Sequence, residues 1–187
     1  MTGTLIINDG KPSNRRREAV CFLLVVLMVF VAGCRKSPDE SNLLIELPVD
    51  DMKHIVSKAD VTFVKDGSKD GNGCIRIDVD GAKFIKLYEI DTIDLEYARL
   101  KYKAEVKTEN FSGDTFLEMW CTFKGKGRFF SRGLEKTLSG TNDWTTLETF
   151  FLLRKGENPD KVELDLVING NGGTIWVDSI RLEKDRL

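Results

Sequence analysis

Apolar residues recur at every second position in several separate runs of this 187-residue chain, and this alternation restricts the fold more than any other sequence feature. The clearest runs are 75–79 (IRIDV), 100–106 (LKYKAEV) and 162–168 (VELDLVI). Successive side chains of a strand point to opposite faces of a sheet, so each run predicts a strand with one buried face. Turn-forming clusters rich in glycine and asparagine separate the runs. The expected fold class is all-β, an antiparallel sandwich or barrel of about eight short strands.

Helical periodicity is almost absent from the same part of the chain. One short helix is expected around residues 50–57, and no internal repeat or low-complexity tract interrupts the strand pattern. The single histidine, His54, lies in this polar stretch, and it is interpreted as a solvated surface residue.

The first 33 residues are typical of an export signal, which would form a signal helix. Three arginines, residues 15–17, precede an apolar run from Ala19 to Ala32. This run is shorter than the roughly 20 residues of a membrane-spanning helix, so a cleaved signal is favoured. An uncleaved signal anchor and a twin-arginine export route remain alternatives.

The sequence VAGC at residues 31–34 resembles the bacterial lipoprotein signal. The resemblance implies that Cys34 receives a diacylglycerol, that cleavage precedes it, and that the mature protein is anchored in the bacterial cell envelope by several acyl chains. The residue after the cysteine is Arg35 and not an aspartate. In enteric bacterial lipoproteins this implies the outer membrane rather than the inner one. Residues 34–42 are expected to form a flexible polar tether, and residues 43–187 one domain.

Charge argues against a nucleic-acid partner. The predicted signal removes four of the 28 basic and two of the 30 acidic residues, which shifts the net charge from −2 to −4. Nucleic-acid binding needs a basic patch that neutralises phosphates, and here charges of both signs alternate along the chain.

Residues 142–184 resemble the end of a carbohydrate-binding module of the galactose-binding-like jelly-roll class (CBM4/9-like). In that class a Trp opens a strand that ends in Phe, and a glycine turn precedes a final strand of the type VWVDDIRL. The first strand corresponds here to Trp144 and Phe150 or Phe151. The turn and the final strand correspond to Gly172, Gly173 and the run 175–182 (IWVDSIRL). The resemblance implies a two-sheet jelly-roll β-sandwich with Trp144 and Trp176 in its core. It also implies non-catalytic binding of a glycan.

The same resemblance implies a structural calcium ion held by Asp178. An early loop would complete the shell with oxygen ligands, and residues 66–73 (DGSKDGNG) offer Asp66 and Asp70. Position twelve of a calcium loop that begins at Asp66 is Ile77, so an EF-hand is excluded. A polar β-turn, with Asp178 accepting hydrogen bonds from nearby backbone, is the alternative.

A sugar site is expected on the strand at residues 115–124. Leu117, Met119, Cys121 and Phe123 form its apolar face, which leaves Phe116, Glu118, Trp120 and Thr122 on the opposite face. The next segment alternates Arg128, Phe130 and Arg132. Aromatic planes beside carboxylates and guanidinium groups suit the C–H faces and hydroxyls of a sugar. The candidate ligand-binding residues are therefore Glu118, Trp120, Arg128, Phe130 and Arg132. Alternatively, a loop at 86–97 with Tyr88 and Tyr97 covers this sheet, and Trp120 belongs to a satellite core.

Cysteines and catalytic motifs restrict the function less. Cys74 and Cys121 alternate with residues of different character, so a disulfide between them and two free thiols both stay open. No G-x-S-x-G sequence occurs, and no pair of acids stands out for glycoside chemistry. The expected function is a lipid-anchored binding module for a glycan. A structural or protein-binding envelope lipoprotein is the alternative, and an enzyme is a third, less favoured class.

Overall fold

The computed structural model describes residues 42–187, which form nine strands. The predicted signal, Cys34 and nearly all of the tether lie outside the described residues. No helix in the described part is long and apolar enough to span a membrane. The strands are β1 (Leu43–Leu47), β2 (Thr62–Val64), β3 (Cys74–Asp78), β4 (Lys83–Asp91), β5 (Ala98–Phe123), β6 (Gly127–Arg132), β7 (Leu138–Leu153), β8 (Lys161–Asn171) and β9 (Thr174–Arg186).

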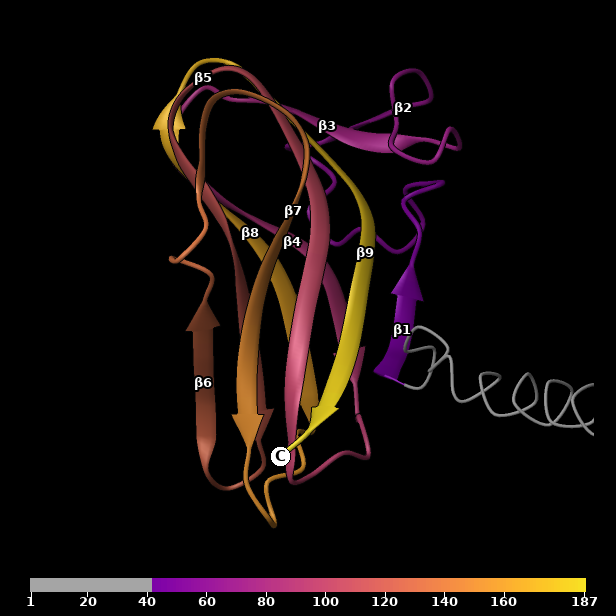
Figure 1. Cartoon of the computed structure of the whole chain (residues 1–187), viewed down its shortest axis with the longest axis vertical. Helices are drawn as coiled ribbons and strands as arrows, with labels where there is room; N and C mark the ends of the chain where they lie inside the picture. Colours follow the sequence, from indigo (N-terminus) through magenta and orange to yellow (C-terminus); the bar gives the residue numbers. More distant parts are fainter. Residues whose placement is uncertain (1–41) are drawn as a thin grey trace, which may run out of the picture. The chain divides into compact units, whose positions relative to one another are not determined.

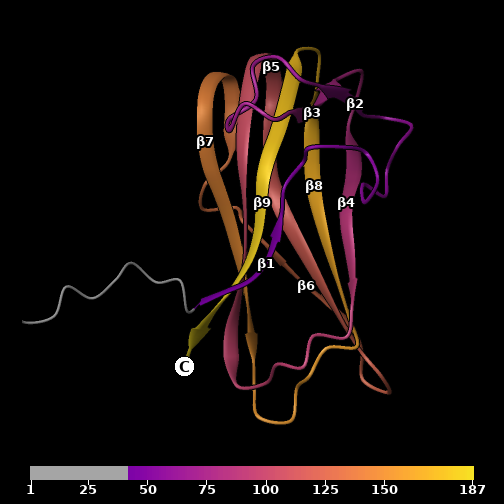
Figure 2. The same cartoon turned by 90° about the vertical axis from the view of Figure 1, so that its right-hand side faces the viewer.

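Two layers share the long strand β5. Its N-terminal half pairs with β7 on one side and β9 on the other, and β9 continues to β3, β2 and β1; these strands form the first layer. Its C-terminal half pairs with β8 and β6, and β8 continues to β4; these strands form the second layer. All pairings are antiparallel. Figure 1 shows the strands from the front, and Figure 2 shows them edge-on, with β7 and β4 on opposite sides. The predicted all-β, two-sheet sandwich is confirmed.

The core fills the space between the layers, as the alternation predicts. Leu117, Met119 and Cys121 on β5 are fully buried, and so are Leu164 and Leu166 on β8. Each of these leucine and methionine side chains contributes about 1.5–3 kcal/mol through the removal of apolar surface from water. The buried face expected for residues 117–123 is therefore confirmed.

The expected helix at 50–57 is wrong. The segment consists of bends, and the backbone N–H groups of Val56 and Ser57 donate to Leu87 O and Lys86 O of β4, at 3.2 and 2.9 Å. Val49, just before the segment, and Ile55 within it are fully buried and six positions apart, a spacing that does not place them on one helical face. Pairing with β4 therefore replaces the hydrogen bonds of a helix.

The expected covering loop at 86–97 is also wrong. Its first part belongs to β4, which extends the second layer beside β8 and so lies within the sheet. Tyr88 points into the core, and Tyr97 is exposed. The loop therefore does not cover Trp120.

Trp144 and Trp176 are half-buried and lie outside the core, which corrects the assignment implied by the family resemblance. Trp176 is on the outer face of the first layer, where the cationic groups of Arg76 and Lys107 lie 5.9 and 5.5 Å from its ring centroid. Its neighbours in sequence, Ile175 and Val177, are fully buried, so strand alternation turns the indole outward.

Cys74 and Cys121 are both buried free thiols. Burial raises the pKa of Cys74 to about 11, with a further contribution from Asp178, and burial raises the pKa of Cys121 to about 12. Both thiols therefore stay protonated and unreactive at neutral pH.

Gly113 lies where β5 crosses between the layers. We expect Gly113→Ala to lower the free energy of unfolding by about 1–3 kcal/mol or more, because the new side chain strains the backbone at this point. Gly113 has φ +138°, and a Cβ at this position would clash with the backbone of Asn169 and Gly170. Urea unfolding would measure the loss. Gly81→Ala is the matched control, since a Cβ at Gly81 has no atom within 4 Å, and equal stability of the two variants would contradict the prediction.

Candidate functional site

The outer face of the second layer, called the site face below, carries rows of side chains across β6, β5, β8 and β4. Directly paired residues of antiparallel strands lie on the same face of a sheet. The first row is Arg132, Glu118, Asp165 and Lys86, and the second is Phe130, Trp120, Glu163 and Glu89. A third row holds Arg128, Thr122, Lys161 and Asp91. Strand pairing therefore gathers aromatic, acidic and basic side chains from four strands.

An aromatic pair lies at the β5–β6 side of the site face. The rings of Trp120 and Phe130 have centroids 4.8 Å apart and are tilted by 51°. The guanidinium of Arg128 lies 4.0 Å from the Trp120 centroid, and that of Arg132 lies 4.6 Å from the Phe130 centroid. Trp120 is half-buried and Phe130 is 49% exposed, so the pair remains accessible to solvent.

Two buried glutamates fix these groups in place. Glu118, only 1% exposed, accepts hydrogen bonds from Trp120 Nε1 at 2.6 Å and from Arg132 Nε. Glu163 accepts a hydrogen bond from Arg128 Nη2 at 2.9 Å and forms an ion pair with Lys86 Nζ. Charge-assisted bonds of this kind are about twice as strong as neutral ones, so the side chains are held in one arrangement.

Asp165 is a buried acid of the site face without an ion-pair partner in the described residues. It is 6% exposed, and its Oδ1 has no hydrogen-bond partner within the described residues. Burial raises the pKa of Asp165 to about 7, and the nearby Glu163 adds to the rise. The carboxyl therefore titrates near neutral pH, unlike an ordinary aspartate.

The structure brings all five predicted ligand-binding residues together. Glu118, Trp120, Arg128, Phe130 and Arg132 form one connected cluster of hydrogen bonds and ring contacts. Their role in binding stays a prediction. Sequence reasoning missed Lys86, Glu163 and Asp165. The outward positions of the run VELDLVI carry two of these acids, but their relevance depends on β8 pairing with β5.

The predicted calcium ligands do not form a cluster. Asp178 is fully buried, and its Oδ2 and Oδ1 accept hydrogen bonds from the backbone N–H groups of Lys69 and Ser179, at 2.7 and 2.6 Å. Asp66 and Asp70 are exposed, and Asp70 accepts hydrogen bonds from Asn72. Residues 42–187 contain no group of three or more histidine, cysteine or acidic side chains that could hold a metal ion. The loop 66–73 thus meets Asp178 through its backbone, and calcium binding stays a prediction.

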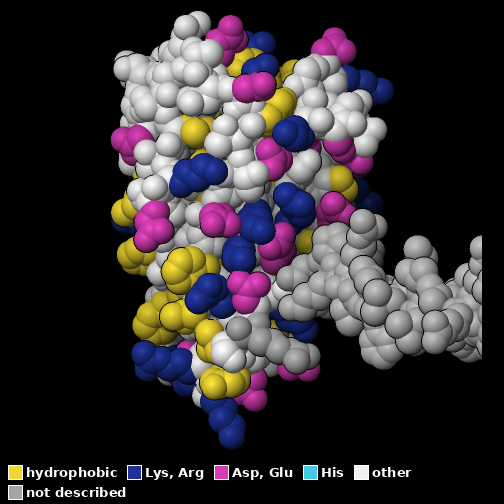
Figure 3. Space-filling view, viewed as in Figure 1, with side chains coloured by type: hydrophobic (Ala, Val, Ile, Leu, Met, Phe, Trp, Pro, Cys, Tyr) yellow, Lys and Arg dark blue, Asp and Glu magenta, His cyan; other side chains and the backbone are white. Residues whose placement is uncertain are grey.

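Exposed apolar side chains also lie on β6 and β7, outside the site face. Phe129, Phe150 and Leu152, called the rim patch below, are each about half exposed. Figure 3 shows hydrophobic side chains over the lower parts of β6 and β7. Such a patch is a candidate surface for contact with another protein.

Comparison with known proteins places the fold. No family model matches the chain, and no curated protein matches it significantly. The xylan-binding CBM22-1 domain of Xyn10C from Paenibacillus barcinonensis superposes with a TM-score of 0.55 at 8% identity, covering 78% of this chain and 96% of that domain. The C-terminal family 22 carbohydrate-binding module of Clostridium thermocellum Xyn10B gives 0.54 at 9% identity, with coverages of 78% and 96%. A family 16 carbohydrate-binding module gives 0.51 at 13% identity, with coverages of 79% and 96%. The chain therefore has the fold of these modules.

We expect Asp165→Asn to remove a pH dependence of stability. In the wild type the folded state retains the Asp165 proton up to about pH 7, whereas the unfolded chain loses it near pH 4. This carboxyl therefore lowers the free energy of unfolding as pH rises from about 4 to 7, with a slope approaching about 1.4 kcal/mol per pH unit. The variant should gain stability relative to the wild type between pH 4 and pH 8, measured by urea unfolding. A constant difference between the two proteins would contradict the assignment.

Proposed function

We propose that the described domain is a non-catalytic glycan-binding module and that the site face binds the glycan. The observation that carries this proposal is the Trp120–Phe130 pair, which is accessible yet fixed by buried glutamates through Trp120 Nε1 and Arg132. A fixed aromatic surface loses little conformational entropy when a ligand binds.

The polar groups around the rings suit sugar hydroxyls. Each guanidinium has five N–H donors, and in the described residues Arg128 and Arg132 each donate to one carboxylate. Donors therefore remain for ligand oxygens beside the apolar ring surfaces. Arg128 covers one face of Trp120, but its side chain is 44% exposed, so an arriving sugar ring can displace it.

The structural neighbours support this choice of ligand. One of them is a xylan-binding domain, and residues in the cleft of the family 22 module of Clostridium thermocellum Xyn10B act in ligand binding. The chain spans 96% of both modules. For this domain we propose the class of ligand only, a glycan, and leave its sugar composition open.

We also propose that the domain is held at the bacterial cell envelope by lipid on Cys34. The support is the sequence of residues 15–34, with its arginines, short apolar run and VAGC ending. Residues 34–42 would then be a tether between the outer membrane and β1. A glycan site on a tethered domain would hold polysaccharide close to the cell.

A second function is favoured by the rim patch. Phe129, Phe150 and Leu152 expose apolar surface beside β6 and β7, as a protein-binding envelope lipoprotein would. Partner binding through this patch would leave the site face free. Substitutions on the two surfaces therefore separate the two functions.

For glycan binding, we expect Trp120→Ala and Phe130→Ala to weaken binding at least about tenfold, which corresponds to about 1.4 kcal/mol. Phe129→Ala is the matched control, because Phe129 and Phe130 are both 49% exposed and lie on opposite faces of β6. The measurement is a glycan array on residues 35–187, followed by titration calorimetry with the sugars that bind. Since Trp120 is half-buried, its loss should cost less stability than the about 3–5 kcal/mol of a core aromatic. A blank array with the folded wild type would reject the proposal, and partner capture lost only in Phe129→Ala would favour the second function.

For the anchor, we expect Cys34→Ser to leave the precursor uncleaved and without lipid, because the thiol is the group that is acylated. Metabolic labelling with a palmitate analogue in a bacterial host, followed by membrane fractionation, measures this. Cys21→Ser is the control, since Cys21 lies inside the apolar run. Equal labelling of wild type and Cys34→Ser would contradict the lipoprotein assignment.

A further inference from the structure

We propose that Asp165 determines the specificity of the site face, by accepting hydrogen bonds from the hydroxyls of a neutral glycan. This inference rests on the proposed function, because it names the ligand class of the same surface. It assigns a role to a residue that neither stacks on a ligand nor supports the aromatic pair.

The first argument is the unsatisfied carboxyl. Buried polar side chains nearly always have hydrogen-bond partners, so an exception in a native fold needs an explanation. Asp165 is 94% buried, and its Oδ1 has no partner within residues 42–187. A ligand hydroxyl that donates to Oδ2, the carboxyl oxygen that is not fully buried, would give Asp165 a hydrogen bond that the described residues do not provide.

The second argument is that neighbouring cations are held by other acids. Lys86 lies opposite Asp165 in the register, yet its Nζ forms its ion pair with Glu163. Arg128 donates to Glu163 as well, and Arg132 donates to Glu118. The charged groups around Asp165 are Lys86 and Glu89 from β4, Glu118 from β5, Arg128 and Arg132 from β6, and Glu163 from β8. The buried hydroxyl of Tyr102 on β5 is a neutral titratable group nearby, and its pKa is raised by burial and further by the charge of Asp165. The acceptor is thus left open in a strongly charged environment.

The third argument is the charge balance of the site face. Three carboxylates, Glu118, Glu163 and Glu89, contact four cations, Arg132, Arg128, Lys86 and Lys161. The site face also carries the exposed Asp91, so with Asp165 ionised its five acids outnumber its four cations by one. A uronic acid sugar would bring a further carboxylate beside Asp165 and Glu118, where like charges repel. A neutral sugar with free hydroxyls meets no such penalty, so the site selects against acidic glycans.

A pH dependence of binding follows. A hydrogen bond from a hydroxyl to a carboxylate is stronger than one to a neutral acid, so ligand binding favours the ionised form of Asp165. Because the free protein holds this proton up to about pH 7, affinity should fall as pH drops below 7, by up to about tenfold per pH unit. Binding at pH 6 should release a proton to the buffer.

The experiment compares neutral and acidic oligosaccharides at two pH values. Residues 35–187 are titrated calorimetrically with xylohexaose, β-1,4-galactotriose, trigalacturonate and any neutral sugar found by the array, at pH 5.5 and pH 8. We expect neutral sugars to bind and trigalacturonate to bind at least tenfold more weakly. Wild-type affinity should fall at least tenfold from pH 8 to pH 5.5, while Asp165→Asn should show weaker binding with little pH dependence.

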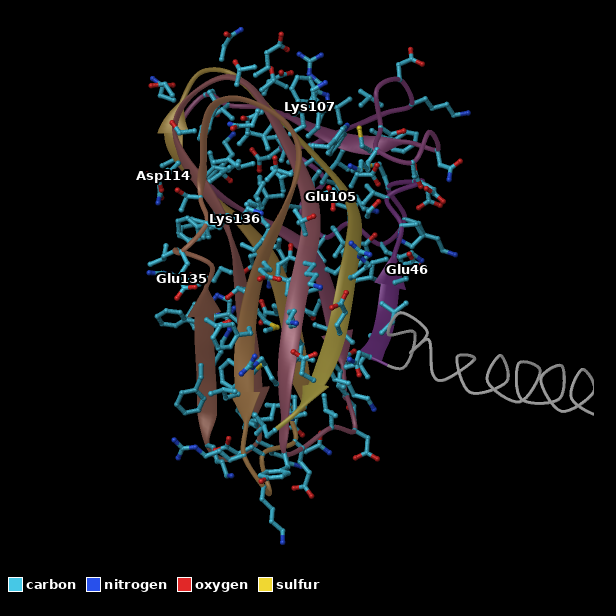
Figure 4. The ribbon with its side chains drawn as sticks, in the orientation of Figure 1. Glu46, Glu105, Lys107, Asp114, Glu135 and Lys136 are labelled. Atoms are coloured by element: carbon cyan, nitrogen blue, oxygen red, sulfur yellow. The ribbon has the colours of Figure 1, made fainter. Side chains whose placement is uncertain are left out.

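Asp114→Asn is the matched control. Asp114 is an acid on the same outward-facing side of β5 as Glu118, in the middle of the strand beside Gly113; Figure 4 shows its position. This variant should keep wild-type affinity and pH dependence. Urea unfolding at pH 8, where Asp165→Asn should be the more stable protein, shows that the variant is folded.

Two failures can be told apart. If sugars bind the wild type, but Asp165→Asn keeps wild-type affinity and pH dependence, or trigalacturonate binds best, the role of Asp165 is overturned and glycan binding stands. If no sugar binds the folded wild type at either pH, the proposed function fails, and the specificity assignment fails with it.

Discussion

One strand belongs to both layers of the sandwich, and the remaining strands are arranged around it. β5 runs for 26 residues; its first half lies between β7 and β9, and its second half lies between β6 and β8. The crossing between the halves needs Asn110 at φ +51° and Gly113 at φ +138°. Glu118 and Trp120 follow this crossing directly. The site face is therefore positioned by the same turn that joins the two layers.

The site face buries three carboxyl groups, and hydrogen bonds and opposite charges offset the loss of their solvation only in part. Removing a carboxylate from water is unfavourable unless hydrogen bonds and opposite charges replace the solvent. Glu118 and Glu163 have such partners, whereas Asp165 has a buried oxygen without one. Local conflicts of this kind concentrate at functional sites, because a ligand can supply what the protein lacks. Stability near neutral pH is thus lowered at the surface where binding is proposed.

Much of the fold could be predicted from the sequence because strand alternation is a local signal. It identified the buried face of residues 117–123 and the outward positions of Glu118 and Trp120. Applied to residues 175–177, the same rule turns Trp176 outward. The family resemblance implied instead that Trp176 is in the core, and that assignment was wrong. The helix at 50–57 failed because backbone bonds to β4, some 30 residues away, determine that segment.

The acids of β8 could not be assigned to the site because their relevance depends on a non-local pairing. Glu163 and Asp165 join the site only because Trp120 and Glu118 lie opposite them, more than 40 positions earlier in the chain. Lys86 requires a second pairing, between β4 and β8. Sequence periodicity determines which side of a strand a residue occupies, but the order of strands in a layer depends on the whole chain. The aromatic half of the candidate site was therefore predictable, and the acids of β8 with Lys86, which are proposed to distinguish ligands, were not.

Strand β6 shows why those polar groups decide between the two candidate functions. Phe129 and Phe130 are adjacent and equally exposed, yet alternation places them in different surroundings. Phe129 lies 6.1 Å from the ring of Phe123, at an apolar edge that suits another protein. Phe130 lies beside Trp120 and the Arg132 guanidinium, within a network that ends at a buried carboxylate. Exposed aromatic area alone is the same on both sides, so the hydrogen-bonding groups around each ring determine which side suits a sugar.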